Sequence, residues 1–354
     1  MKNINKIDGI KILRFISALA ILIWHYQHFN YPLTDSSRII DQPFFNILKI
    51  FYTKGYMAVN FFWCISGFIF FWKYGEKIKN ITFAIFFKSR FSRLYPLHFL
   101  TLILVLILQK IYFYHIEDLY IYKNNDFFHF ILQFFMASNW GFENASSFNG
   151  PIWSISIEVI IYGFFFILLK TLKNSILVNL SIILICLVIK IFYEHQASQI
   201  VDCALFFFTG GCVSFFINYL ENMSRIILKL LLAPIIFFLI YLIIDRQIYN
   251  LNNFNYIFQL IFFPLTIFFF CDISSKNKNI SNLFSFLGNL TYSSYLLHFP
   301  VQLLITIFFI YSGKEIPFFN NYFFIFYISF VLSISWISYN YFENPMKNYI
   351  RNNF

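Results

Sequence analysis

The sequence places a cation and an imidazole on one apolar segment near its start. Arg14 begins the run Arg-Phe-Ile-Ser-Ala-Leu-Ala-Ile-Leu-Ile-Trp-His, and His25 ends it. In an α-helix the two side chains fall within about 20° of one face and stand about 16 Å apart along the axis. Such a stripe is costly in a bilayer unless it faces a cavity or a partner. We interpret it as the lining of a pore for a long, phosphate-bearing donor. The alternative is an Arg14 that snorkels to the membrane surface and a His25 with one structural hydrogen bond.

A second candidate group is a carboxylate inside another apolar segment. An Asn-Gly-Pro turn at 149–151 predicts a helix start, and Ser154, Glu158 and Tyr162 then recur at intervals of four on one face. Glu158 lies about 10 Å inside that helix, where a lone carboxylate is expensive. We therefore expect Glu158 to pair with His25 at a compatible depth and to orient its imidazole as a base.

Two arginines three residues apart form a candidate phosphate site. Arg90 and Arg93 can point the same way on a helical turn, and the guanidinium group suits bidentate phosphate binding. With Arg14, also near the expected cytoplasmic boundary, they could hold a polyphosphate. The alternative is that both residues only anchor the next helix at the membrane surface.

The remaining candidates lie around Tyr295 and His298, which are also three residues apart. A second buried histidine could line an acceptor site, or it could make only a structural hydrogen bond. Ser66 and Gly67 are expected to allow close helix packing rather than to react. The other histidines are expected to be solvated or interfacial: His28, His98, His115, His129 and His195.

The composition indicates a polytopic, all-α integral membrane protein. Of 354 residues 59% are hydrophobic and 12% are charged, against roughly 25% charged residues in soluble domains. The first apolar run lacks a small-residue cleavage site, so we do not interpret it as a signal peptide. The five cysteines stand singly in apolar runs, which favours reduced structural thiols over disulfides or a metal site. The net charge of +10 could suggest nucleic acid, but its distribution favours membrane orientation.

The apolar runs predict about ten transmembrane helices in one domain covering residues 1–354, with no fused soluble domain. The expected spans are 10–29, 55–72, 97–114, 151–169, 175–193, 201–219, 226–244, 256–271, 289–311 and 322–341. With both termini in the cytoplasm, only eight of the 26 basic residues fall outside or at outer helix ends: Arg38, Lys49, Lys54, Lys110, Lys123, Lys190, Arg246 and Lys314.

The connections of this arrangement carry their own expectations. Residues 30–54 form an outer loop, and the basic stretch 73–96 forms the main cytoplasmic loop. In the long segment 115–150, an apolar piece at 127–135 is too short to span and is expected to be an interfacial or re-entrant helix.

Together these motifs resemble membrane acyltransferase family 3, bacterial integral membrane acyltransferases that modify surface glycans. The resemblance covers nearly the whole chain. The motifs follow in the family's order: Arg14 with His25, Phe61-Phe62-x-x-x-Ser66-Gly67-Phe68, Arg90-x-x-Arg93-x-x-Pro96, Trp153-Ser154-x-x-x-Glu158, Ser293-x-Tyr295-Leu296-x-His298 and Glu343-x-Pro345. The chain departs from the family in placing Asp8-Gly9 three residues further upstream, and in having Ala58 and Asn60 where a Gly and an Asp are common.

The resemblance implies transfer of an acyl group, most often acetyl, from cytoplasmic acyl-coenzyme A to a hydroxyl of a glycan such as O-antigen, capsule or exopolysaccharide. Arg14, Arg90 and Arg93 would bind the donor phosphates. His25, with Glu158, would act as general base, or His25 would form an acyl-histidine intermediate. The acceptor site is expected to include Trp153, Ser154, Tyr295 and His298.

The expected setting is the bacterial inner membrane, with membrane lipid and a glycan acceptor as partners and neither a metal nor nucleic acid. The sequence leaves the oligomeric state open. The alternative function is a transporter or flippase for a lipid-linked glycan, whose translocation path would be lined by the same polar residues. Against it, the sequence shows a cytoplasmic cluster of arginines and no repeated halves.

The excess of basic residues on one side yields a topology prediction. Reporter fusions at Lys77 and at Lys347 should both report the cytoplasm, and a fusion at Asn124 should report the outside. An external signal at Lys347 would mean an odd number of spans and would contradict the ten-helix arrangement.

Overall fold

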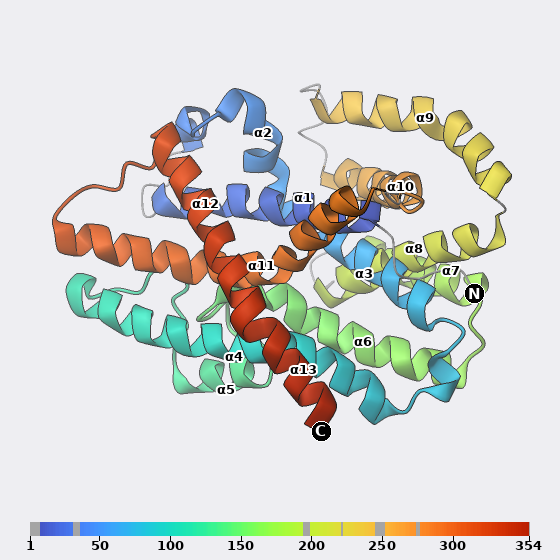
Figure 1. Cartoon of the computed structure of the whole chain (residues 1–354), viewed down its shortest axis with the longest axis horizontal. Helices are drawn as coiled ribbons and strands as arrows, with labels where there is room; N and C mark the ends of the chain where they lie inside the picture. The colour runs from blue at the N-terminus through green and yellow to red at the C-terminus, as the bar shows by residue number, and fades with distance from the viewer. Residues whose placement is uncertain are drawn as a thin grey trace. The chain divides into compact units, whose positions relative to one another are not determined.

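The computed structural model describes residues 8–30, 36–193, 199–220, 222–244, 252–273 and 277–353, and all regular elements in these ranges are helical (Figure 1). The all-α prediction is therefore confirmed. The α-helices are α1 (Asp8–His25), α2 (Phe45–Lys54), α3 (Ala58–Tyr74), α4 (Phe83–Ile116), α5 (Phe127–Phe134), α6 (Trp153–Thr171), α7 (Ile176–Phe192), α8 (Gln199–Tyr219), α9 (Asn222–Ile244), α10 (Asn252–Phe270), α11 (Lys278–Ser312), α12 (Asn321–Ser338) and α13 (Asn344–Asn353).

Within the described ranges, seven helical stretches are long and apolar enough to cross a membrane. They are Asp8–Asn30, Phe45–Tyr74, Phe83–Ile116, Gly150–Thr171, Gln199–Tyr219, Lys278–Ser312 and Asn321–Asn353, and two shorter apolar helices are Ile176–Phe192 and Phe258–Phe270. Each of the ten predicted spans overlaps one of the observed helices. The positions of the helices are thus confirmed, whereas the number of membrane crossings and the side on which the termini lie stay predictions.

The chain divides into two compact units. The first contains Met1–Ser17, Met57–Ile81 and Ile161–Gly288, and the second contains Ala18–Tyr56, Thr82–Ile160 and Asn289–Phe354. Helices α1, α6 and α11 each contribute residues to both units.

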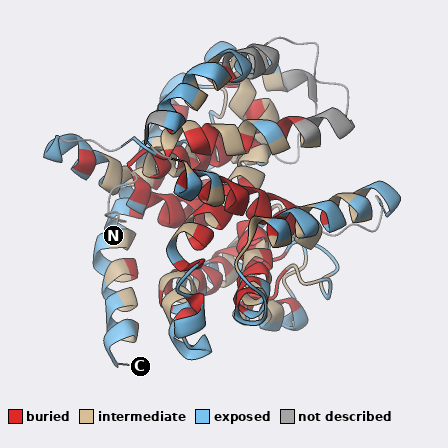
Figure 2. Cartoon of the chain, turned by 90° about the vertical axis from the view of Figure 1, so that its right-hand side faces the viewer, coloured by how far each residue is buried: buried red, intermediate tan, exposed pale blue. Residues whose placement is uncertain are grey.

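The first unit is built on the close approach of α3 and α8. A Cβ atom added to Gly67 on α3 would stand 1.7 Å from the carbonyl oxygen of Phe207, and one added to Gly210 on α8 would stand 1.8 Å from that of Cys64. The two backbones therefore meet directly, as small residues allow in membrane helices. Helix α8 is buried along most of its length, and buried residues are red in Figure 2. The packing role expected for Gly67 is confirmed.

The beginning of α1 is fixed in the first unit by a buried carboxylate. Asp8 is fully buried and lies 3.0 Å from Lys11 Nζ, and Ser281 Oγ donates to it at 3.3 Å. Lys11 also donates to Ser285 Oγ at 2.7 Å. Asp8 and Lys11 thus join the start of α1 to the start of α11.

In the second unit the end of α1 is embedded in an aromatic cluster. Tyr26 and Phe29, just beyond His25, pack against Tyr52, Phe324 and Tyr327. Tyr26 Oη also donates to the carbonyl oxygen of Phe318 at 2.8 Å. These rings bury a large apolar area and hold the residues around His25 in place.

Two segments expected to be loops are largely helical, which corrects the sequence prediction. Helix α4 already begins at Phe83, so that Arg90 and Arg93 lie inside it rather than in a loop over 73–96. Thr82 caps this helix by accepting a hydrogen bond from the Ile85 N–H at 3.3 Å. The segment 30–54, expected to be an outer loop, contains α2. Basic and polar residues suggested loops, but they are interspersed with aromatic and aliphatic residues that favour helices packed on the unit.

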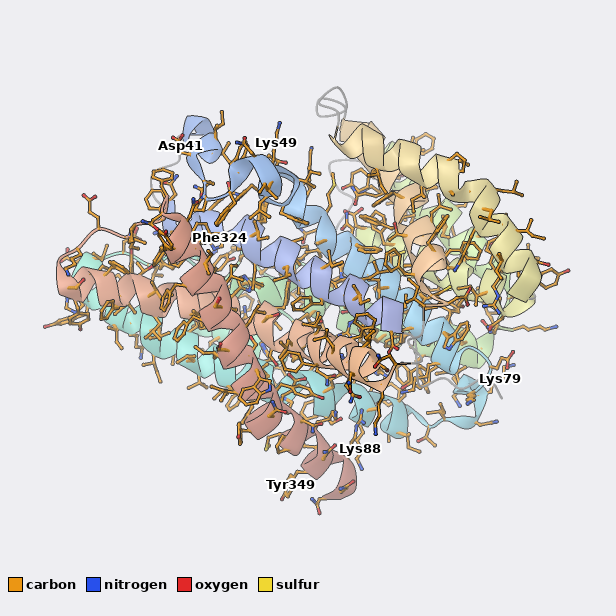
Figure 3. The ribbon with its side chains drawn as sticks, turned by 45° about the horizontal axis from the view of Figure 1, so that its top comes forward. Asp41, Lys49, Lys79, Lys88, Phe324 and Tyr349 are labelled. Carbon is orange, nitrogen blue, oxygen red and sulfur yellow. The ribbon has the colours of Figure 1, made fainter. Side chains whose placement is uncertain are left out.

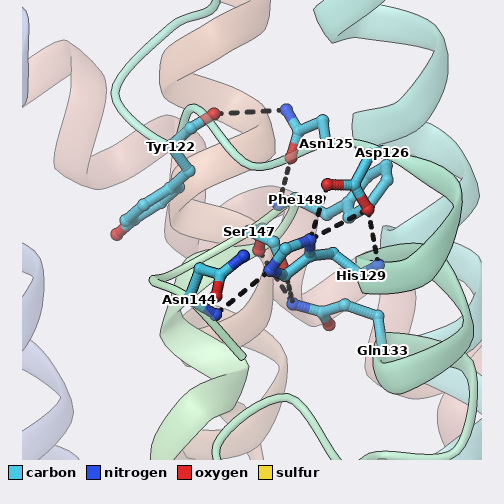
Figure 4. Close-up of polar contacts among 8 residues, drawn as sticks. All are labelled: Tyr122, Asn125, Asp126, His129, Gln133, Asn144, Ser147 and Phe148. Atoms are coloured by element: carbon cyan, nitrogen blue, oxygen red, sulfur yellow. Dashed lines mark hydrogen bonds and ion pairs between the residues drawn. The ribbon is translucent and has the colours of Figure 1, made fainter. Parts of the chain in front are cut away.

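The segment between α4 and α6 is ordered by a polar network (Figure 4). Asp126 caps α5 by accepting from the His129 N–H at 2.9 Å, and its carboxylate also lies 2.8 Å from His129 Nδ1. These hydrogen bonds lower the pKa of Asp126. The Asn144 N–H donates to His129 Nε2 at 3.4 Å, and Gln133 donates to the carbonyl oxygen of Ser147 at 2.8 Å. The short helix expected at 127–135 is confirmed as a helix, and the network fixes the turn that follows.

Asn149, at that turn, joins three parts of the second unit. Its fully buried side chain donates to Thr101 Oγ1 on α4 and to the carbonyl oxygen of Leu296 on α11, both at 3.0 Å. The next residues, Gly150 to Ile152, form a short 3-10 turn that leads into α6. The start of α6 is therefore held against α4 and α11, and this determines where its polar face begins.

The close contact of α3 with α8 gives a stability prediction. Gly67→Ala should cost more than about 3 kcal/mol, the upper range of ordinary overpacking, because the new methyl group meets backbone rather than a movable side chain. Gly211→Ala is the matched control, since its Cβ would meet side-chain atoms of Phe71 and Asn179, at 2.5 and 2.6 Å. Thermal unfolding of the purified variants in one detergent measures the difference. Equal melting temperatures for Gly67→Ala and wild type would contradict the packing.

Candidate active site

Three histidines meet in the second unit around the end of α1. The ring centroid of His25 lies 4.8 Å from that of His298 and 4.9 Å from that of His28. Gln302 joins them, since its amide donates to the His25 carbonyl oxygen at 2.8 Å and its oxygen lies 3.3 Å from His28 Nδ1. The structure thus brings together His25 and His298, which are far apart in sequence. It also adds His28 and Gln302, which the sequence analysis did not select.

The His25 ring has a defined orientation. Its Nδ1 lies 3.0 Å from the carbonyl oxygen of Ile21, one helical turn earlier. A carbonyl oxygen can only accept, so the neutral imidazole carries its proton on Nδ1 and has its lone pair on Nε2. The side chain is half-buried rather than enclosed. Nε2 is therefore the nitrogen that could accept a proton or attack an electrophile.

His298 is more deeply buried than its neighbours. It has no solvent exposure, and neither ring nitrogen makes a hydrogen bond of normal geometry to any described residue. The carbonyl groups of Ser294 and Tyr295, on the preceding turn, are close enough to interact with the ring. A buried imidazole without a full set of partners is costly in a fold and is common where a ligand supplies them.

A pair of hydroxyl groups adjoins this cluster. Ser154 Oγ lies 2.7 Å from Tyr295 Oη, and Tyr295 also donates to the carbonyl oxygen of Pro151 at 2.8 Å. The rings of Tyr295 and His298 are 6.0 Å apart between centroids. The start of α6 and the middle of α11 therefore bring Ser154, Tyr295 and His298 together, and Trp153 is half-buried beside Ser154. Their roles in binding stay predictions.

Glu158 lies one turn further along α6 than Ser154. It is half-buried, and its carboxylate is within electrostatic range of the hydroxyl groups of Tyr292 and Tyr295 on α11. The ring contacts recorded for His25 are with Trp24, His28 and His298. The pairing of Glu158 with His25 therefore stays a prediction.

The three arginines are distributed over both units. Arg90 and Arg93 lie one turn apart on α4 and are half-buried. Arg93 is within electrostatic range of Tyr339, in the π-helical turn Tyr339–Glu343 that follows α12. Arg14 lies in the part of α1 that belongs to the first unit, so a joint phosphate site with Arg90 and Arg93 stays a prediction.

Several histidines differ from their expected environment. His98 is fully buried, with Nε2 2.7 Å from the carbonyl oxygen of Gln133, and the His129 side chain is 1% exposed. The expectation that these rings are solvated was wrong for both. His98 bonds to a backbone carbonyl group that only the tertiary fold brings near, whereas the buried His129 ring pairs with the largely exposed Asp126 on the preceding turn. His115 is exposed as expected, and His195 lies outside the described residues. The five cysteines are free and buried.

Among the residues that the structure describes, no group of three or more His, Cys, Asp or Glu side chains is arranged to hold a metal ion. Apolar helices long enough to cross a bilayer, with buried imidazole and hydroxyl groups among them, define a multi-pass membrane protein with a polar site inside.

Comparison with known proteins identifies the family. A sequence model described as an acyltransferase domain matches residues 7–340. The chain therefore belongs to acyltransferase family 3 and is an acyltransferase, which favours the enzyme over the transporter considered above. It is also 44% identical over 54 residues to "Protein 2 in picA locus" of Rhizobium radiobacter, a stretch that covers 15% of this chain and 28% of that protein. No solved structure matches the chain.

The orientation of His25 gives a prediction for activity. His25→Ala should lower acyl transfer about a hundredfold or more, because general base or nucleophilic catalysis through Nε2 is lost. Release of free thiol from acetyl-coenzyme A by purified protein measures it, and His115→Ala, which removes an exposed histidine, should be unaffected.

Glu158→Gln keeps the shape of the side chain and should also cut activity strongly. If the two residues act as a unit, the double variant should be little worse than His25→Ala alone. Wild-type rates in a well-expressed His25→Ala protein would refute the assignment and would move attention to His298.

Proposed function

We propose that the protein is an O-acyltransferase, and specifically an O-acetyltransferase. It would take the acyl group from cytoplasmic acyl-coenzyme A and transfer it to a hydroxyl of a cell-surface or lipid-linked glycan. The observation that carries the proposal is His25, half-buried and held through Nδ1 so that Nε2 is available for chemistry. Membership of an acyltransferase family gives the reaction type. The donor, the acceptor and the location in the bacterial inner membrane are parts of the proposal.

In the general-base mechanism, His25 Nε2 accepts the proton of the acceptor hydroxyl as its oxygen attacks the thioester carbonyl carbon. The new C–O bond forms, the C–S bond breaks, and the departing thiolate takes the proton from the imidazolium. The products are an O-acyl ester and a free thiol. Glu158 would orient the imidazole or stabilise its charged form.

The competing mechanism uses the same nitrogen as a nucleophile. Nε2 attacks the thioester carbon and the C–S bond breaks, which leaves an acyl-imidazolium and a thiolate. The acceptor hydroxyl then attacks the acyl carbon, the C–N bond breaks, and the hydroxyl proton passes to the thiolate, so that the products are again an ester and a free thiol. The hydrogen bond from Nδ1 to Ile21 suits both mechanisms because it leaves Nε2 free in each. Incubation with acetyl-coenzyme A in the absence of acceptor, followed by mass spectrometry of the peptide that contains His25, distinguishes them.

The hydroxyl and aromatic groups next to the imidazoles support the proposal that a glycan acceptor binds there. Sites for polar ligands combine aromatic surface with a few placed hydroxyl groups, and Trp153, Ser154 and Tyr295 supply both kinds of group at the start of α6 and on α11. Analysis of O-acyl groups on surface glycans from a deletion strain, with and without the complementing gene, tests the class of acceptor. Unchanged acylation of every surface glycan would contradict the proposal.

The half-buried arginines of α4 give a prediction for donor binding. Arg93→Ala or Arg90→Ala should weaken coenzyme A binding by about 1.5–3 kcal/mol, about tenfold to a hundredfold, because a charge-assisted phosphate contact is lost. Lys110→Ala is the matched control, since it removes an exposed cation near the other end of the same helix. Isothermal titration in lipid nanodiscs measures affinity. Unchanged affinity in both arginine variants would assign the pair to membrane anchoring.

A further inference from the structure

Besides the arginines of α4, the second unit has basic residues on its C-terminal helix. These residues belong to none of the motifs described above. Glu343, Lys347 and Arg351 recur at intervals of four and therefore share one face of the helical stretch that ends in α13. The Lys347 ammonium group is within electrostatic range of Arg351, of Glu343 and of Arg93 on α4. We call Arg93, Lys347 and Arg351 the basic cluster.

Helix α13 is attached to α4 by polar contacts. None of its residues is buried. Arg351 Nε donates to Ser92 Oγ at 3.2 Å, and its Nη2 donates to the Ser89 carbonyl oxygen at 3.3 Å. Figure 3 labels Lys88 on α4 and Tyr349 on α13, close to where these two helices meet. Arg351 thus attaches α13 to α4, and Lys347, one turn earlier, lies within electrostatic range of Arg93.

The carboxylate beside the basic cluster, Glu343, is buried and hydrogen-bonded within the protein. Glu343 is 4% exposed and accepts a hydrogen bond from Ser293 Oγ at 2.6 Å. It ends the π-helical turn Tyr339–Glu343, an element that is costly and often marks functional sites. One carboxylate faces three cations, so the cluster has a surplus of positive charge. Arg93 and Lys347 are half-buried, whereas Arg351 is exposed, and half-buried cations close to one another are unfavourable unless an anion joins them.

Lys347 is the member of the cluster that is available to such an anion. It is half-buried, and no hydrogen bond or ion pair is recorded for its ammonium group with the described residues, whereas Arg351 uses its donors on Ser89 and Ser92. Its nearest recorded charges include two further cations. A multiply charged phosphate compound fits this environment, since it would neutralise several cations at once.

We propose that Lys347, acting with Arg93, binds a phosphate group of the acyl donor and that the C-terminal helix is therefore part of the donor site. The proposal rests on the proposed function, because it takes acyl-coenzyme A as the donor. An anionic lipid headgroup also carries a phosphate group, and the experiment below distinguishes binding of the acyl donor from binding of lipid.

The test compares wild type with Lys347→Ala, Lys347→Gln and Lys77→Ala in nanodiscs of zwitterionic lipid. Lys77 is an exposed lysine whose removal changes the net charge equally. Loss of Lys347 should raise the dissociation constant of coenzyme A about tenfold or more, and Lys77→Ala should leave it unchanged. Loss of Lys347 should raise KM for acetyl-coenzyme A and so slow its turnover. Turnover of acetyl-pantetheine, which has no phosphate, should fall less. A loss of packing alone would lower both turnovers equally.

The outcomes separate this inference from the proposed function. Wild-type protein that neither binds coenzyme A nor uses its thioesters would refute the proposed function itself. Wild-type protein that binds coenzyme A, with unchanged affinity in both Lys347 variants, would overturn the role of Lys347 alone. An effect of Lys347 that appears only as altered thermal stability in nanodiscs containing anionic lipid would assign the basic cluster to a lipid headgroup and would also overturn the inference.

Discussion

A polar group buried among apolar helices must find its hydrogen-bond partners within the protein, because lipid and hydrocarbon side chains offer none. In the second unit the N–H groups of buried amide side chains meet this constraint by donating to distant segments. Asn149 links the start of α6 to α4 and α11, and Gln302 links α11 to the end of α1. Gln133 fixes the segment before α6 through Ser147. The hydrogen bonds that these amide N–H groups donate therefore help to decide which segments surround His25.

This network explains why the imidazoles can gather where they do. His25 is tied to its own helix, His28 lies beside Gln302, and His298 enters from α11. Aromatic rings from α12 and α2 pack around the adjoining turn. Of these three imidazoles, His298 alone makes no hydrogen bond of normal geometry to the described residues. The two histidines at the end of α1 therefore have hydrogen-bond partners, and the histidine on α11 does not.

The sequence predicts the helices and the individual reactive groups better than it predicts their contacts. Periodicity and apolar runs locate all ten predicted helices, and the cost of burying His25 and Glu158 marks both as functional candidates. The His25–His298 contact depends on how α11 packs on α1, which no local pattern encodes. His28 had a local signal, since it follows His25 by one helical turn, but its place near a helix end suggested exposure. The start of α4 was missed because basic residues outweighed the aromatic residues among them.

The contacts of His298 connect the two halves of the proposed reaction. Its ring touches that of His25 on one side and lies near Tyr295 on the other, and Tyr295 is hydrogen-bonded to Ser154. A general base must come within about 2.6–3.2 Å of the hydroxyl that it deprotonates. On the proposed function, an acceptor bound against Ser154 and Tyr295 reaches His25 past His298, and its hydroxyl groups are the partners that the His298 nitrogens lack. On this proposal the buried imidazole on α11 would orient the acceptor, and the half-buried imidazole on α1 would act on the thioester or on the acceptor hydroxyl.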